Sequence, residues 1–200
     1  MNNLRLSAKI GIGVVFAMVA LHYAFHQPFI PGAVFSAIPE EATSTYLADN
    51  LAELLQSPVC GQIDRALGAG NSLAALLGSN DWTRLAAASE IAVADIPLRH
   101  PGQSKTWVAA SWVGWRSPWL RWKLTHAHNA NLRLLGKHSV WPVWAYEAPD
   151  IARGMSLTFA LTDNLFLACL SESPSDILLL LETYDRSFIR TTSSEWETLK

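Results

Sequence analysis

The order of hydrophobic and polar positions predicts one apolar N-terminal helix followed by a domain of helices and strands. An uncharged, mostly apolar run extends from Ile10 to Phe25. At about 1.5 Å per residue this run spans only about 24 Å, whereas the hydrocarbon core of a bilayer is about 30 Å thick. Extending the helix back to Leu4 removes the shortfall, and Pro28 ends it. We therefore predict a membrane span over residues 4–27.

The charges on either side of this run predict its orientation. Arg5 and Lys9 precede it, and no further Lys or Arg occurs before Arg65. The positive-inside rule then places the N-terminus in the cytoplasm and the remainder outside, which for a bacterial inner membrane means the periplasm. A cleaved signal peptide is the competing interpretation, but the small-x-small pattern of a cleavage site is missing, because Met18 precedes Ala20 and His22 precedes Ala24 by two positions. A buried soluble helix is a third interpretation, disfavoured because the run lacks amphipathic periodicity.

Residues 31–186 have the pattern of a single α+β domain, between the anchor of residues 1–30 and a polar tail of residues 187–200. Expected strands are at 33–38, 90–96, 106–113, 131–135, 140–146, 156–161 and 165–170, and expected helices at 39–55, 59–67, 73–78, 81–87, 117–126 and 173–186. Short hairpins, turning around Gly136 and at Asp163-Asn164, connect consecutive strands. We therefore expect a mainly antiparallel sheet with helices packed on one face. Pro142 predicts an edge or bulged strand.

Four segments of the chain resemble a family of bacterial membrane-anchored, extracytoplasmic proteins of unknown function. They are AVFSAIPEEA, ASEIAVADIP, TWVAASWVG and LTFALTDNLFLACLSESPSDIL. Members of that family show an "IP-x-x-A" start and a strand-turn-strand-Ser-helix finish. The resemblance implies an anchored envelope domain and supplies no catalytic residues.

The most unusual stretch runs from Pro97 to Tyr146, which contains no Asp or Glu but seven of the nine Trp. Trp and Arg are enriched in the energetic centres of protein interfaces. The candidate residues for binding a partner or lipid are Trp115, Arg116, Trp119, Arg121, Trp122, Lys123, Trp141 and Trp144.

Three interpretations of this stretch remain open. On a helix from Ser117, Trp119, Trp122 and His126 share one side, and Leu120 and Leu124 are expected to extend that apolar arc. The rings then either fill the core, dock a partner protein, or contact anionic headgroups or an acidic glycan. Nucleic acid is excluded as a partner by the predicted compartment and by the net charge of −2.

Motifs of known chemistry are missing from the sequence. His126-x-His128 cannot bind one ion from a helix, because positions two apart point in nearly opposite directions. Gly70 to Ala74 resembles a nucleophile elbow, but Ser72 is better explained as a helix cap. Cys60 and Cys169 either form a disulfide or remain buried thiols.

We therefore expect no cofactor, no metal and no enzymatic activity. The predicted function is that of a membrane-anchored envelope protein whose outer domain binds or scaffolds a partner protein. The alternatives are an anchored extracytoplasmic hydrolase, with catalytic residues drawn from separate loops, and a domain that contacts lipid headgroups or glycan.

Overall fold

The structure is a computed structural model of the whole chain. It describes residues 11–19, 21–22, 29–68, 72–78, 81–97, 105–126, 131–147, 151 and 154–197, with the backbone alone at 76, 78, 81 and 188–197. Seven strands form one sheet in the spatial order β1-β2-β3-β7-β6-β5-β4, and every neighbouring pair is antiparallel. The strands are β1 (Ser44–Ala48), β2 (Ile91–Ile96), β3 (Thr106–Trp112), β4 (Leu132–His138), β5 (Trp141–Tyr146), β6 (Ser156–Leu161) and β7 (Leu165–Ser171). The predicted α+β class with an antiparallel sheet is confirmed.

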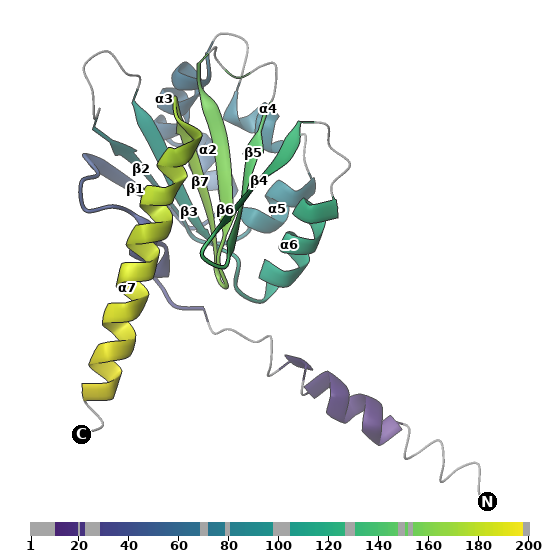
Figure 1. Cartoon of the computed structure of the whole chain (residues 1–200). Coiled ribbons are helices and arrows are strands. Elements are labelled where there is room, and N and C mark those ends of the chain that lie inside the picture. The colour runs from purple at the N-terminus through teal and green to yellow at the C-terminus, as the bar shows by residue number, and fades with distance from the viewer. Residues whose placement is uncertain are drawn as a thin grey trace, which may run out of the picture.

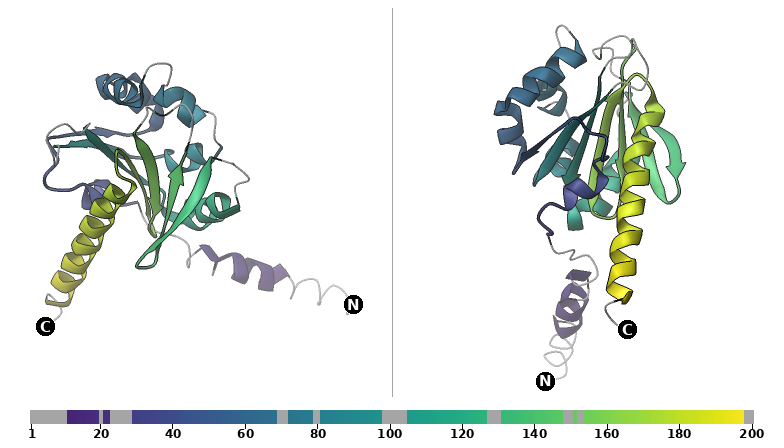
Figure 2. Two further views of the ribbon diagram at one scale, coloured as in Figure 1. Left: turned by 45° about the horizontal axis from the view of Figure 1, so that its top comes forward. Right: turned by 90° about the vertical axis from the view of Figure 1, so that its left-hand side faces the viewer.

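Helices cover both faces of the sheet, so the prediction of helices on one face is wrong (Figures 1 and 2). The helical segments are η1 (Ala33–Ala37), α2 (Leu51–Gln56), α3 (Pro58–Leu67), α4 (Leu73–Gly78), α5 (Asp81–Ala86), η2 (Gly114–Arg116), α6 (Ser117–His126), η3 (Pro174–Asp176) and α7 (Ile177–Glu197). Side chains of α2, α3, α5 and α6 meet one face in what we call the first core. Those of η1 and α7 meet the other face in the second core.

The second face was missed because its side chains are small. On β2, Ile91 and Val93 point into the first core, while the alternate positions Ala92 and Ala94 are fully buried in the second. Alanines at alternate positions resemble a solvated face in the sequence. Here they let α7 and η1 pack closely against the sheet.

The start of the domain also differs from the prediction. The expected strand at 33–38 is the short 3₁₀ helix η1, which buries Val34 and Ala37 at a spacing of three. The expected helix from Pro39 is replaced by a turn and strand β1. Helix α2 begins only after Asn50, whose side chain accepts a hydrogen bond of 3.0 Å from the backbone N–H of Glu53.

The hairpin of β4 and β5 turns later than expected, at Ser139 and Val140 rather than at Gly136. The pairing register shifts between Leu134 and Gly136, so β4 contains a bulge. Pro142 pairs with β4 alone, because the pairing of β5 with β6 starts at Val143. The prediction that the strand of Pro142 is an edge or bulged strand is therefore wrong, because both the bulge and the sheet edge belong to β4.

The C-terminal segment is helical further than expected. Helix α7 continues to Glu197, so residues 187–197 extend the helix instead of starting a tail. Ser173, whose position before Pro174 and Asp176 predicts a side-chain cap, precedes η3, but only its backbone carbonyl accepts the bond from the Asp176 N–H, so the predicted cap is wrong.

Residues 11–19 are helical and lie outside the sheet domain (Figure 1). Among the described residues, no helix combines the length and hydrophobicity needed to cross a bilayer. Residues 4–10, 20 and 23–27 of the predicted anchor lie outside the described part of the chain.

Candidate docking surface on helix α6

Helix α6 is held against the sheet by one side. Strand β3 ends at Trp112, and the chain turns through Gly114, whose φ of 49° is in the left-handed region that favours glycine. Ser117 then donates a buried hydrogen bond of 2.9 Å to the carbonyl oxygen of Thr162. Leu120 and Leu124 are 0% and 3% exposed in the first core. Leucine packing and one buried hydrogen bond therefore fix the orientation of the helix.

The opposite side of α6 carries exposed aromatic rings. Trp119 and Trp122 are 51% and 52% exposed, and their rings stack with centroids 5.0 Å apart and planes 14° apart. The ring of His126 stacks on Trp122 at 5.2 Å, and Trp115, just before the helix, is 65% exposed. We call Trp115, Trp119, Trp122 and His126 the α6 aromatic surface. Because Trp is usually highly buried, three exposed indoles on one short segment are unusual.

The expectation that Leu120 and Leu124 extend the same apolar arc is wrong. At about 100° per residue, Leu124 lies roughly 140–160° around the helix from Trp119 and Trp122. The helix has two apolar sides, and only the aliphatic one is buried. This separation could have been predicted from the sequence, because an angle of about 100° per residue places the leucines and the indoles on different sides of the helix.

The predicted basic residues contribute less to this surface than expected. Arg116 turns inward: its guanidinium donates to the carbonyl oxygens of Val113 and Trp112 and to Oγ of Ser89. Partial burial lowers the pKa of Arg116. Arg121 and Lys123 are half-buried. At about 100° per residue, Lys123 lies about 40° around the helix from Trp119, whereas Arg121 lies about 160° from it. Lys123 is thus the candidate cation beside the rings, and Arg116 has a structural role.

Trp141 and Trp144 do not join the α6 aromatic surface. Trp144 is 1% exposed and packs in the first core. Trp141 packs against the second core, where its Nε1 donates to Oδ1 of Asp185 at 3.1 Å and its ring meets Tyr184 edge-on. The two positions are three apart on β5, so strand alternation places them on opposite faces. Both are core residues.

The two cysteines are free and buried, so the disulfide alternative is not realised in this structure. Cys60 lies on α3, whose buried residues Ile63 and Leu67 pack in the first core. Cys169 lies in the second core, on the other side of the sheet. Burial raises the pKa of Cys169 to about 12 and also raises that of Cys60, where Asp64 adds to the effect. Both thiols are therefore protonated and unreactive at neutral pH.

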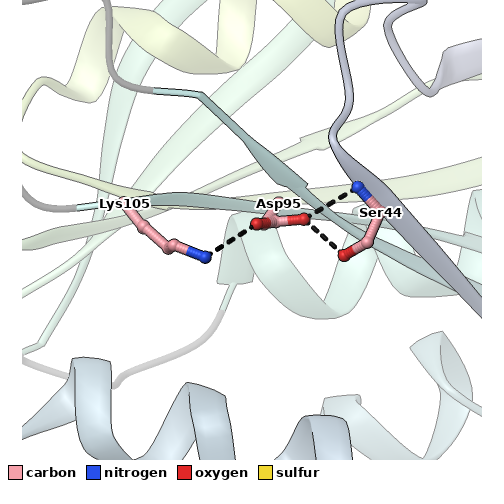
Figure 3. A network of polar contacts seen from close by, with 3 residues as sticks. All are labelled: Ser44, Asp95 and Lys105. Carbon is pink, nitrogen blue, oxygen red and sulfur yellow. Dashed lines mark hydrogen bonds and ion pairs between the residues drawn. The ribbon is translucent and has the colours of Figure 1, made fainter.

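Asp95 is the one acidic residue with its side chain buried among the described residues. It accepts hydrogen bonds from the Ser44 N–H at 2.9 Å, the Ser44 hydroxyl at 2.5 Å and the Lys105 ammonium group at 3.0 Å (Figure 3). Burial alone would raise the pKa of Asp95, but these bonds and the charge of Lys105 together hold it below its usual value. The carboxylate joins β1 to the start of β3 and is fully engaged, which fits a structural role and not acid–base chemistry.

The other chemical motifs have structural explanations where they are described. Ser72 accepts a bond of 3.0 Å from the Ala75 N–H and so caps α4, as expected. His128 lies outside the described residues, and His126 belongs to the aromatic stack. Within the described residues, no three His, Cys, Asp or Glu side chains are grouped as metal ligands would be.

Comparisons with models of protein families, with curated proteins and with solved structures gave no match. The resemblance to bacterial membrane-anchored extracytoplasmic proteins therefore stays a prediction.

Proposed function

We propose that this chain is a single-pass protein of a bacterial inner membrane, with residues 4–27 in the bilayer and the α+β domain in the periplasm. The domain acts without catalysis, by docking a partner protein through the α6 aromatic surface. The hydrolase hypothesis gains no supporting observation from the described residues.

The observation that carries this proposal is the exposure of Trp115, Trp119 and Trp122 on a helix already fixed by its other side. Their exposed halves amount to roughly 300 Å² of mostly apolar surface, because a Trp side chain presents about 200 Å². Burying this area contributes on the order of 7 kcal/mol before the costs of association, which are themselves about 4–15 kcal/mol. The three rings therefore suit the centre of an interface, and contacts around them must supply the rest of the binding free energy.

The charge around the rings indicates the chemistry of that rim. Lys123 lies about 40° around the helix from Trp119, and Pro97 to Tyr146 contains no acidic residue. Complementary potentials accelerate association and select partners. We expect an acidic partner surface with a cleft that accepts stacked aromatic rings.

Site-specific photocrosslinking in intact cells tests the docking proposal. A photoreactive phenylalanine analogue is placed at Trp119 or Trp122 and, as a matched control, at Val140, which is 63% exposed on the hairpin of β4 and β5. The two α6 positions should give the same discrete protein adduct, and Val140 should not. Absence of a protein adduct at both α6 positions, with the protein present in the membrane, would contradict docking.

The bilayer itself is the second candidate for the docking surface, and one contact favours it. Phe29, which directly follows the predicted span, packs edge-on against Trp112 at 5.7 Å. The N–H of Gly32 donates to the carboxylate of Glu90 at 2.9 Å. These contacts hold the segment that follows the proposed span against the end of β3, three residues before Trp115. Trp prefers the interfacial layer of a bilayer, so Trp115 is well placed to reach it.

Vesicles distinguish the two candidates. The full chain is reconstituted in nanodiscs of neutral or anionic lipid, and quenching of Trp fluorescence by brominated lipid is compared between wild type and the Trp115→Phe/Trp119→Phe/Trp122→Phe variant. Quenching that disappears in the variant supports contact with the bilayer, whereas equal quenching supports docking to protein.

The topology has its own test. Alkaline carbonate should leave the protein in the membrane, and protease added to spheroplasts should digest the domain. Release by carbonate, or a protected domain, would overturn the anchored arrangement while leaving the docking surface to be judged by crosslinking.

A further inference from the structure

A pocket with a hydrocarbon wall lies in the first core, between helices α2 to α5 and the sheet. Its volume is about 120 Å³, and Leu54, Leu67 and Phe159 are among the side chains that line it. Natural protein interiors are so closely packed that few voids exceed the size of one water molecule. An engineered apolar cavity of about 150 Å³ stays free of water and binds benzene. The pocket therefore has a size at which a small hydrocarbon group binds.

Two small side chains at the centre of the sheet leave this space. Ala109 of β3 and Ala168 of β7 are paired across the two strands, and both line the pocket. Both are only half-buried, although helices cover this face of the sheet. The next pair on the same face, Trp107 and Leu170, is large and buried. The two alanines thus form the floor of a depression between larger neighbours.

The wall of the pocket excludes polar occupants. Among the described residues, no charged side chain lines it. The lining hydroxyls of Thr83 and Ser111 already donate to the carbonyl oxygens of Leu77 and Ala86, respectively. A buried water typically needs about two to four polar partners, and any other buried polar group also needs a hydrogen bond. A group made of carbon and hydrogen alone is therefore favoured.

The pocket reaches the surface at α2 and α4. Leu51, Leu73 and Leu77 line it and are only half-buried. They belong to helices of six residues each, which are stabilised mainly by their packing, so opening beside them has a small cost. An opening lets a chain enter while a polar head attached to it stays in water.

We propose that this pocket binds the end of an alkyl chain, about six carbon atoms long, whose polar head remains outside. The length follows from the volume, because a slightly larger cavity holds the six carbon atoms of benzene. Leucine in place of both Ala109 and Ala168 would also add about six carbon atoms, so the chain replaces side-chain volume that the sheet lacks. This inference does not depend on docking through α6.

Methyl NMR of the full chain in nanodiscs tests the proposal with soluble alkyl glucosides, of which only the chain fits the pocket. Leucine methyl groups are labelled with ¹³C, and single Leu→Ile substitutions identify their signals. Hexyl glucoside should shift the signals of Leu54 and Leu67 saturably and leave that of Leu180, in the second core, unchanged. Methyl glucoside should shift none of them.

Chain length provides a second measurement. Each buried CH₂ group tightens binding about fourfold, so butyl glucoside should bind about 15-fold more weakly than hexyl glucoside. Heptyl glucoside should gain less than about twofold over hexyl glucoside, because about six carbon atoms fill the pocket. Equal affinities for butyl and hexyl glucoside would contradict insertion of the chain.

The same nanodiscs identify the source of the chain. Nuclear Overhauser contacts between the Leu54 or Leu67 methyl groups and lipid chains, before any glucoside is added, would identify a membrane lipid. Binding of hexyl glucoside without such contacts would identify a soluble amphiphile.

Two variants that fill the pocket complete the test. Ala109→Leu and Ala168→Leu should each weaken binding of hexyl glucoside at least about tenfold, whereas Val140→Ala, on the exposed hairpin of β4 and β5, should not change it. If neither Leu variant folds, Overhauser contacts between Leu67 and the hexyl chain in the wild type decide the question. No saturable shift of Leu54 or Leu67 in the wild type, or unchanged affinity in a folded Ala109→Leu, would show a dry packing void and overturn the proposal.

Discussion

Lys105 donates a hydrogen bond to Asp95 across 3.0 Å, although the Lys105 side chain is 61% exposed and the Asp95 side chain only 6%. The lysine precedes β3 and the aspartate is on β2, while Ser44 of β1 binds the other carboxylate oxygen. One buried acid thus connects the first three strands of the sheet.

Replacing this acid should destabilise the domain more than replacing its basic partner. Asp95→Asn keeps the shape but places an amide donor where the carboxylate accepts, and we expect a loss of about 1–3 kcal/mol in the free energy of unfolding. Lys105→Met removes an exposed charge and leaves both bonds from Ser44, so its effect should be about 0–1 kcal/mol. Urea denaturation of both variants at pH 7 measures the difference. Equal losses of unfolding free energy in the two variants would show that Asp95 is not the residue that holds the three strands together.

The lowered pKa of Asp95 also predicts how stability depends on pH. A carboxyl whose pKa is lower in the folded state stabilises fully above its unfolded pKa, near 3.9, and loses that contribution as pH falls through its folded pKa. Wild type should therefore lose stability below about pH 4 more steeply than Asp95→Asn. Parallel curves of unfolding free energy between pH 2 and 7 would contradict this.

Truncation on the two sides of α6 should destabilise the domain to different extents. Leu120→Ala removes a fully buried side chain and should cost about 2–5 kcal/mol. Trp119→Ala removes an exposed ring and one stacking partner, so we expect at most about 1.5 kcal/mol. Thermal unfolding of both variants makes the comparison. A larger loss for Trp119→Ala would mean that the rings belong to the core.

Two Gly→Ala substitutions should have opposite signs. At Gly114 a Cβ would lie 2.9 Å from Nε1 of Trp112 at positive φ, so Gly114→Ala should destabilise by about 1–3 kcal/mol. Gly61 lies inside α3 with open space around it, so Gly61→Ala should stabilise by about 0.5–1 kcal/mol. Calorimetric melting of the two variants tests the pair. The same sign at both positions would rule out this account of the turn before α6.

Both cysteines should remain reduced and unreactive in the native protein. Their raised pKa values and burial keep the nucleophilic thiolate scarce. Ellman's reagent at pH 8 should react slowly with the native chain and with two thiols after unfolding in guanidinium. A disulfide-linked peptide in a non-reducing digest would instead place Cys60 and Cys169 within bonding distance.

The sequence predicts the strands and helices from Ser57 onward well, because local signals and tertiary packing agree there. Ser57-Pro58 starts α3, and Asp163 with Asn164 turns the hairpin of β6 and β7. The segment before Asn50 fails for a physical reason. Its apolar positions at 33–38 fit a strand or a single 3₁₀ turn equally well, and only packing against α7 and β3 decides between them.

The candidate site was only partly predictable. Composition identified the tryptophans, and the exposure of Trp115, Trp119 and Trp122 excludes the core interpretation for these three. Whether the other candidate side chains are buried depends on the fold. Strand alternation places Trp141 and Trp144 on opposite faces of the sheet. Backbone carbonyl oxygens accept hydrogen bonds from Arg116 and hold its side chain inward.

The bulge in β4 has a consequence for how this domain can associate. The outer strand β4 is irregular at Leu135 and carries the exposed cations Arg133 and Lys137, while the opposite outer strand β1 has only five residues. Irregularity, charge and brevity each discourage a foreign chain from extending a sheet by backbone pairing. At high concentration the domain is thus protected from forming a fibre by edge-to-edge strand pairing. A partner must therefore be recognised through side chains and not through the backbone of an edge strand.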